Sequence, residues 1–361
     1  MRQKLRVTIV YNEPNVSGGV GRKFISTSGV LQEGVDERLA RSTVVDLSEL
    51  GVLEGVDNVH VSLRELGYDV SVFNITDNIA ELITFLEKEK PDLIFNLCES
   101  LGRVAIHEMH VAGIFELLGL RYTGSPPLTL GIALNKICVK ELLLHHGINT
   151  PKYVVYRSAT EIVEDDFSLQ FPVIVKPSME DASTGIEAAS VVDTFPALKK
   201  RVRWVFQQYD QPALVEEFID GRELNVSMIG TRKPIILPFS EIDFSTLPPD
   251  FPRILTYDGK WLKGTPAYSG TKGIRPSDLP PTVEAQLKEI ALRVFRLLGC
   301  RDYARVDFRL SRNNVPYVLE INPNPDISDD AGFARSAKAS GRTYAQVVQK
   351  IVESALERSC G

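Results

Sequence analysis

The sequence YVLEINPNPDIS, residues 317–328, begins as a strand and ends in an acid, an amide and a rigid turn. Side chains of successive strand residues point to opposite faces. This alternation places Val318, Glu320 and Asn322 on one face, and the prolines at 323 and 325 then end the strand before Asp326. A strand that leaves the core through oxygen-bearing side chains indicates a binding site at its end.

The preceding segment, YARVDFRL at 303–310, carries charged side chains on one face and apolar ones on the other: Arg305, Asp307 and Arg309 against Val306, Phe308 and Leu310. If SRNN at 311–314 forms a turn, Asp307 and Glu320 are neighbours across a hairpin, beside Arg305. Two adjacent carboxylates repel unless a cation joins them, and two acids with an amide offer the oxygen ligands that Mg²⁺ prefers. The alternative is an ordinary hairpin with a solvated polar face.

The composition is that of a soluble globular protein of two or three domains. The chain has 361 residues, too many for one hydrophobic core, with 43% apolar and 24% charged residues. Its net charge of −6 argues against a nucleic-acid binder. No apolar run reaches membrane-spanning length, and MRQKLRVTIVYNEP at the start is typical of a strand rather than a signal peptide. Four well-separated cysteines favour reduced thiols and a cytoplasmic location.

Two weaker motifs do not support a site. His107 and His110 have a spacing that zinc can use, but no third ligand is evident. GGVG at 18–21 lacks the Lys-Ser/Thr ending of a P-loop, so residues 13–47 are predicted to form a long polar loop.

The N-terminal segments alternate between strand and helix patterns. Strands are predicted at 5–11, 69–75 and 92–99, and helices at 56–66, 78–89 and 107–120. This order is typical of a small parallel sheet with helices on its faces. The turn-rich YTGSPP, residues 122–127, ends this α/β domain.

Three domains are expected, at 1–125, 126–212 and 213–361, with an α+β character in the C-terminal part. ALVEEFIDGRELNVSMIG, residues 213–230, contains two strands joined across a turn motif at Asp220 and Gly221. The irregular stretch 243–281 is long and rich in proline and glycine, so it is predicted to be a lid. A helix at 283–298, the hairpin and a helix from about Tyr344 complete the chain.

Residues in the middle of the chain suit a nucleotide. Lys176 ends an apolar strand, where a mobile ammonium group can reach a phosphate, although alone it would be an ordinary surface lysine. The following loop, SMEDASTG at 178–185, has small residues whose N–H groups could surround phosphate oxygens. The strand ending at Glu216, Glu217 and Phe218 can offer backbone groups to a purine, with Glu223 as a ribose acceptor.

In this order and spacing, the motifs resemble the ATP-grasp superfamily and, within it, the D-alanine–D-alanine ligases. The resemblance covers residues 92–326, about two thirds of the chain. It is clearest in LGLRYTGSPPLTLGIALNK, FPVIVKPSMEDASTGI, LVEEFIDGREL and GCRDYARVDFRL…YVLEINPNPDIS. It implies an ATP-grasp fold of three domains, with ATP held between the sheets of the second and third.

The resemblance also implies residue roles. Contacts to ATP would come from Lys136, Lys176, Glu216, Glu217, Ile219 and Glu223. Two Mg²⁺ ions, which Mn²⁺ could replace, would be held by Asp307, Glu320 and Asn322. Catalytic contacts would come from Arg305, Ser183 and Lys260, the last from the mobile loop.

The amino-acid half of the site departs from the family pattern. Ala182 stands where the family has the first of two serines, and Trp261 replaces the tyrosine that bonds to it. Losing both partners of a polar pair is milder than losing one, which indicates a re-tuned site. Beyond the metal-binding asparagine the family has a glycine, then a serine and a leucine that grip the carboxylate of the second D-alanine; these positions are here Asp326, Ala331 and Gly332. Candidates for the family's N-terminal glutamate, which binds the first amino group, are weak: Glu13, Glu49 and Glu54.

The sequence therefore predicts an ATP-dependent, ADP-forming carboxylate–amine ligase. It would join an amino acid or small peptide to an amine through an acyl phosphate, with substrates other than two D-alanines. Two alternatives stay open: a genuine D-alanine–D-alanine ligase with an altered pocket, and an ATP-binding sensor or partner protein without turnover. Small-molecule substrates are expected, with no nucleic acid or membrane, and the family suggests a homodimer.

Overall fold

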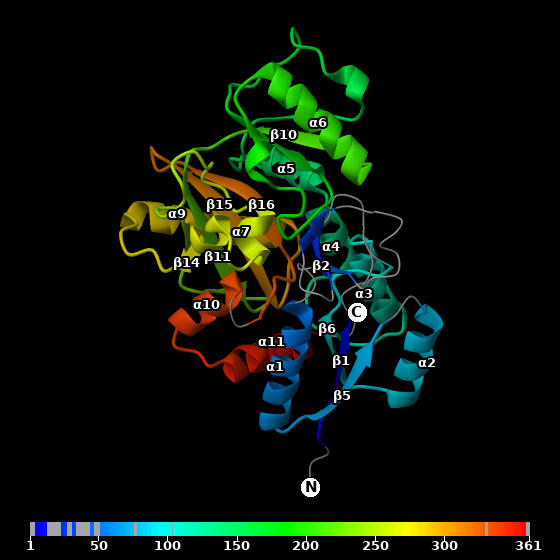
Figure 1. Cartoon of the computed structure of the whole chain (residues 1–361). Helices are drawn as coiled ribbons and strands as arrows, with labels where there is room; N and C mark the ends of the chain where they lie inside the picture. Colours follow the sequence, from blue (N-terminus) through cyan, green and yellow to red (C-terminus); the bar gives the residue numbers. More distant parts are fainter. Residues whose placement is uncertain are drawn as a thin grey trace.

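The computed structural model describes residues 4–12, 23–26, 31–33, 44–46, 51–75, 78–102, 104–328 and 331–358. Figure 1 shows three main groups of elements: a blue-to-cyan α/β group, a green group above it, and a yellow-to-orange group beside both.

The N-terminal group is the predicted parallel sheet with helices on both faces. Its strand order is β5–β1–β6, and both pairings are parallel: β5 Asp69–Asn74, β1 Arg6–Tyr11 and β6 Leu93–Leu97. Its helices are α1 Gly51–Glu65, α2 Ile79–Glu89 and α3 His107–Leu117. Val7 and Ile9 pack with α1, whereas Val10 packs with Leu82 of α2 and Phe115 of α3. Alternating strand side chains thus fill a core on each face.

The predicted loop at 13–47 is wrong where the structure describes it. Three short strands form an antiparallel sheet of order β3–β2–β4: β2 Lys23–Ser26, β3 Leu31–Glu33 and β4 Val44–Asp46. The GGVG segment, Glu13 and Glu49 lie outside the described residues. Strands this short carry too little pattern for their sequence to separate them from a loop.

Two helices lead into a central antiparallel sheet. The helices are α4 Pro127–Leu134 and α5 Lys136–His145. The sheet has the order β7–β10–β8–β9, built from β7 Tyr153–Tyr156, β8 Val173–Pro177, β9 Val191–Val192 and β10 Ala213–Glu217. Helix α6, Phe195–Tyr209, packs Leu198 and Val202 against Val175 and Val215 of this sheet. Single turns of 3₁₀-helix, η3 Ala159–Glu161 and η4 Ala188–Ser190, flank it.

The third large sheet carries the hairpin. Its order is β14–β13–β11–β15–β16, with β12 paired to β11. The strands are β11 Gly221–Ile229, β12 Ile235–Ile236, β13 Ser240–Asp243, β14 Lys272–Ile274, β15 Tyr303–Ser311 and β16 Pro316–Asn322. Helix α9, Pro281–Leu297, covers its apolar face, where Val306, Phe308 and Leu310 are buried. The two strands predicted around Asp220 and Gly221 form, but β10 and β11 lie in different sheets, so that turn motif closes no hairpin.

The hairpin pairing is as predicted, with one correction. Asp307 is paired with Glu320. The register then shifts, so that Phe308 pairs with Val318 and Leu319 has no partner. This β-bulge turns Val318 into the core, where it is 1% exposed, rather than onto the face of Glu320. The alternation counted from the sequence was wrong at Val318 because it assumed an unbroken strand.

The predicted lid is less irregular than its composition indicates. Residues 243–281 contain α7 Tyr257–Trp261, α8 Pro266–Ser269 and β14.

Helix α10, Gly332–Ala339, was not predicted, and α11, Tyr344–Leu356, packs against α1 (Figure 1). The domain boundaries stay a prediction. Two elements of the predicted C-terminal domain, residues 213–361, contact other groups: β10 pairs within the central sheet, and α11 packs against the N-terminal core. Among the described residues, no helix combines the length and the apolar character needed to span a membrane.

Candidate active site

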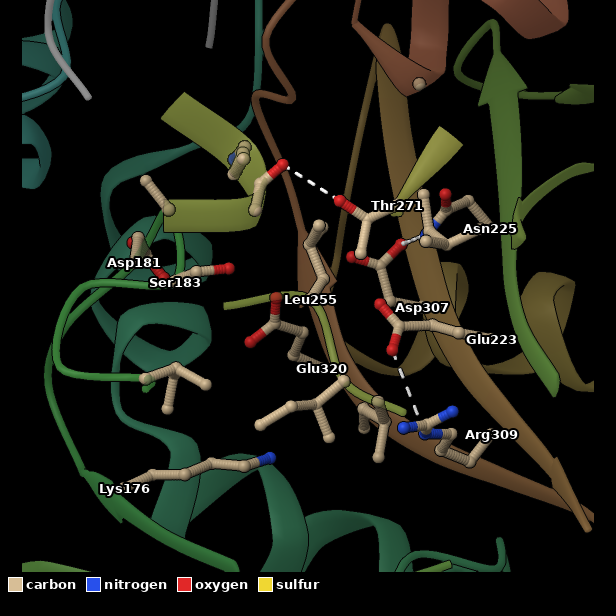
Figure 2. A pocket seen from close by; sticks show the side chains of 18 of the residues that line it. Lys176, Asp181, Ser183, Glu223, Asn225, Leu255, Thr271, Asp307, Arg309 and Glu320 are labelled. Atoms are coloured by element: carbon tan, nitrogen blue, oxygen red, sulfur yellow. Dashed lines mark hydrogen bonds and ion pairs between the residues drawn. The ribbon is translucent and has the colours of Figure 1, made fainter. Parts of the chain in front are cut away.

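A cavity of about 710 Å³ lies between the central sheet and the third sheet. All residues to which the resemblance gives an ATP, metal or catalytic contact line it, from Lys136 of α5 to Asn322 of β16, as do Trp261 and Asp326. Figure 2 shows Asp307, Glu223 and Arg309 on one side, Lys176, Asp181 and Ser183 on the other, and Glu320 between them. Segments that are distant in the sequence therefore meet at one place.

Asp307 accepts hydrogen bonds from three side chains on its wall of the cavity. Arg305 donates to both carboxylate oxygens of Asp307, from Nε and Nη2, at 2.7 Å each. Asn225 Nδ2 donates at 2.7 Å and Asn322 Nδ2 at 3.0 Å. Bidentate charge-assisted bonds of this kind fix both groups in place. Asn225 was missed from the sequence, although it follows Glu223 by two residues on the same strand face, which is a usable signal.

Glu320 projects into the cavity beside Asp307 and faces lysines of the opposite wall (Figure 2). Its Oε2 lies 3.5 Å from Nζ of Lys136, which is also 3.3 Å from Oδ1 of Asp181. Burial raises the pKa of Glu320, but the charges of Lys136, Lys176 and Arg305 outweigh burial and lower it. For Lys136, burial lowers the pKa, but Asp181 and Glu320 raise it above its usual value. Both groups are therefore held in their charged forms.

A buried Lys–Glu–Lys cluster supports the far wall. Glu216 is 1% exposed, and its two oxygens each lie 2.8 Å from an ammonium group, Oε1 from Lys140 and Oε2 from Lys176. Burial raises the pKa of Glu216, but the two lysines lower it to about 2. Lys140 is fully buried, so burial lowers its pKa despite Glu216, and its Nζ also donates to Thr150 at 2.6 Å. No local sequence pattern marks Lys140, because its contact crosses from α5 to β10.

Beyond this cluster the cavity has an apolar end next to Glu223. Ile174, Phe218, Ile219 and Leu319 line this region together with Glu217. Oε2 of Glu223 lies 3.7 Å from Nε of Arg309, and burial raises the pKa of Glu223. An apolar lining with one nearby carboxylate has the character of a site for a flat heterocycle and an attached sugar.

The segment predicted to be a lid, residues 243–281, contacts the loop 178–185 beside the cavity. Nε1 of Trp261 donates to the carbonyl of Ala182 at 3.0 Å. Lys260, next to it on α7, lines the cavity with Arg305 and Ser183. Burial and the positive charge of Arg305 lower the pKa of Lys260.

A smaller cavity of about 150 Å³ continues past Lys260, Trp261 and Arg305 toward the N-terminal group. Its far wall includes Glu99 and Glu108, neither of which was a sequence candidate. Glu108 accepts a hydrogen bond from Asn324 Nδ2 at 2.8 Å, and burial raises its pKa to about 8. No local pattern marks Glu108, because only the packing of α3 against the turn at 323–325 brings it here. Glu54, the described one of the three weak candidates, is exposed on α1 and lines neither cavity.

The histidine pair forms no metal site in the part of the chain that the structure describes, where no group of three His, Cys, Asp or Glu side chains could hold a metal ion. His107 Nδ1 instead contacts the carbonyl of Leu101 at 2.9 Å.

Comparison with known proteins identifies what this arrangement resembles. Residues 142–353 match the family model described as D-ala D-ala ligase C-terminus. The chain is 31% identical to a D-alanine–D-alanine ligase of Carboxydothermus hydrogenoformans over 83% of this chain and 92% of that protein. It is 33% identical to "Uncharacterized protein y4sG" of Sinorhizobium fredii, over 84% and 88% of the two chains.

Solved structures agree on the fold. The crystal structure of D-alanine–D-alanine ligase from Bacillus anthracis complexed with ATP aligns with a TM-score of 0.71, covering 98% of this chain and 97% of that one. At 21% sequence identity, this similarity establishes the ATP-grasp fold. The resemblance and the mixed α/β fold class predicted from the sequence are both confirmed.

Proposed function

This chain belongs to the D-alanine–D-alanine ligase family of ATP-grasp ligases, and we propose that it joins an amino acid or small peptide to an amine other than a second D-alanine. The donor carboxylate oxygen attacks the γ-phosphorus of ATP, the bond from that phosphorus to the bridging oxygen breaks, and ADP leaves. The amine nitrogen then attacks the carbonyl carbon of the acyl phosphate. Phosphate departs, the nitrogen loses a proton, and an amide bond remains.

The residues of the main cavity suit these steps. Lys136 and Lys176 would bind the phosphates, while the slot at Glu216, Glu217 and Ile219 would take the adenine and Glu223 the ribose. Arg305, Lys260 and Ser183 would stabilise the negative charge that develops on the transferred group and the tetrahedral intermediate. Fixed positive charge aimed at developing negative charge is commonly the largest catalytic contribution.

The neighbouring oxygen ligands fit a divalent cation. Asp307 and Glu320 are adjacent across the ladder, with Asn322 beside them and all three in the cavity wall. Hard cations such as Mg²⁺ prefer carboxylate and amide oxygens. When bound, Mg²⁺ or Mn²⁺, two ions as the family resemblance implies, would neutralise phosphate charge.

The substrate proposal is supported by the walls of the smaller cavity. Glu99 and Asp326 supply carboxylates there, which suit an ammonium-bearing substrate rather than a second carboxylate. Glu108 adds a carboxyl group that its raised pKa keeps largely protonated near pH 7. Asp326 occupies a position that in the family precedes the grip on the second D-alanine. The main alternative is a genuine D-alanine–D-alanine ligase, the activity named for the relative to which this chain is 31% identical.

Domain organisation, assembly and location extend the proposal. Three domains, at 1–125, 126–212 and 213–361, would move relative to one another as the lid opens and closes. Cys98, Cys138 and Cys300, the described cysteines, are all free thiols, in keeping with action in the cytoplasm. A homodimer is proposed from the family, and light scattering of the purified protein tests it.

The observation that carries the proposal is the pairing of Asp307 with Glu320 opposite Lys136 in one cavity. The test incubates the protein with ATP, Mg²⁺ and panels of amino acids and dipeptides, and measures released phosphate, with hydroxylamine to trap an acyl phosphate. We expect phosphate release that depends on one acid–amine pair. Absence of release with every pair contradicts the ligase assignment, whereas efficient formation of D-alanyl-D-alanine contradicts only the substrate assignment.

A further inference from the structure

Each end of helix α7 in the lid makes a hydrogen bond to the segment 178–186. Trp261, the last residue of α7, donates from Nε1 to the carbonyl of Ala182 at 3.0 Å. Tyr257, the first residue, donates its backbone N–H to the carbonyl of Ile186 at 2.9 Å. The helix is short, and its N-cap Thr256 accepts from the N–H of Gly259 at 3.0 Å. These bonds join two segments separated by about 80 residues of sequence.

The position of Lys260 depends on the same helix. Its Nζ lies 4.7 Å from the centroid of the Trp261 ring, a distance at which the ring face attracts a cation. Lys260 lines both cavities, together with Arg305. Its ammonium group therefore sits where the two cavities join, and any movement of α7 displaces it.

The acceptor of the tryptophan bond is a backbone carbonyl in an unusual conformation. Ala182 and Ser183 have φ values of 55° and 62°, both in the left-handed region. For residues with a Cβ this conformation costs about 1 kcal/mol or more per residue, so contacts elsewhere must hold it. A backbone acceptor is present whatever side chain occupies position 182. The bond thus needs only an N–H group at position 261.

We propose that Trp261 is a positioning residue that latches the lid onto the loop 178–185 through its indole N–H and so holds Lys260 at the junction of the two cavities. The latch closes the main cavity over its contents and excludes water, to which an acyl phosphate is sensitive. The contact stands on the geometry alone, whereas its role in catalysis rests on the proposed function.

Two substitutions separate the donor from the ring. Trp261→Phe removes the N–H and keeps an aromatic face for Lys260. Trp261→His keeps a donor, because Nε2 of histidine occupies the ring position of the indole Nε1, but it loses the six-membered ring. Trp204→Phe is the matched control, since Trp204 is the only other tryptophan in the sequence and lies on α6 outside both cavities.

The test measures hydrogen exchange of backbone amides in the ligand-free protein at pH 8, where the histidine is neutral. With Trp261→Phe, the amides of Tyr257 and of α7 should exchange about threefold to tenfold faster, as expected from the loss of one hydrogen bond. Trp261→His should restore slow exchange, and amides of α9 should not change. Unchanged exchange in Trp261→Phe, or equally fast exchange in both variants, overturns the latch.

A second readout tests the catalytic role. With ATP, Mg²⁺, the best acid found in the screen and hydroxylamine, Trp261→Phe should release more phosphate per hydroxamate formed than Trp204→Phe, because water enters a loosened site. Trp261→His should return the ratio toward that of the control. If exchange changes as expected and the ratio does not, the latch holds but its role in excluding water is refuted. If no acid supports turnover, the proposed function fails, and the exchange experiment still decides the latch.

Discussion

Replacing Glu320 with glutamine separates a role in metal binding from a role in folding. The change keeps the shape of the side chain and removes its negative charge. The Glu320 side chain is 33% exposed, and its ion pair with Lys136 spans 3.5 Å. Lys136 keeps a second acidic partner in Asp181 at 3.3 Å, so no buried cation is left unpaired by the substitution.

The two expected magnitudes differ enough to be distinguished. A partly exposed ion pair contributes about 1 kcal/mol or less, so the free energy of unfolding should hardly change. A group that holds a fixed charge at the reacting centre contributes about 3 kcal/mol to transition-state stabilisation. At about 1.4 kcal/mol per tenfold, Glu320→Gln should lower kcat/KM by more than about a hundredfold. It should also raise the Mg²⁺ concentration needed for half-maximal rate.

Phosphate release at varied Mg²⁺ and urea unfolding of the same preparations measure both quantities. Glu284→Gln is the matched control, since Glu284 lies on α9 in a surface pair with Lys288 and outside the cavity. Turnover by Glu320→Gln within about threefold of the control would refute the metal site. A large loss of stability would show that Glu320 acts mainly in folding.

Three further predictions follow from the same geometry. The pKa of Glu216 is lowered from 4.5 to about 2 in the folded protein, so its contribution to stability is present above pH 4.5 and is lost as the pH falls toward 2. The free energy of unfolding should drop by up to ~3 kcal/mol over this range. Glu216→Gln should remove that pH dependence. Gly221→Ala places a Cβ 2.0 Å from the carbonyl oxygen of Leu310 and should lower the free energy of unfolding in urea by about 3 kcal/mol. The control Gly67→Ala, at a φ of 88° with open space around it, should lower it by about 1 kcal/mol. Equal losses of stability in the two variants would contradict the clash. EDTA should stop ATP consumption. It should not lower the thermal unfolding midpoint of the nucleotide-free protein, because Arg305 already neutralises the charge of Asp307 without a metal ion. A lowered midpoint would indicate a structural metal instead.

The local sequence pattern was sufficient to predict those parts of the site whose residues are close together in the chain. Asp307 and Glu320 are joined by a short turn, so strand alternation and one turn assignment predicted their pairing correctly. The same reasoning was wrong at Val318, because a bulge is a departure from alternation that no residue type at 319 announces.

Contacts between distant segments were not predictable in this way. Lys140 meets Glu216 across 76 residues of sequence, and Glu108 meets Asn324 across 216. β10 and β11 are consecutive strands, yet they belong to different sheets. Which segments meet depends on how sheets and helices pack over the whole chain, and periodicity within one segment carries no information about that.

The sequence by itself determined the chemical groups available and their order: two lysines, the acid and amide oxygens at the end of β16, and a small-residue loop. These follow from side-chain identity and from repeats of two or about four residues. The tertiary structure alone decided which of these groups share a cavity, that a tryptophan reaches a backbone carbonyl 79 residues away, and that two glutamates of the N-terminal group close the smaller cavity. Those contacts arise from the packing of distant elements, whose free energy belongs to the assembled core rather than to any one segment.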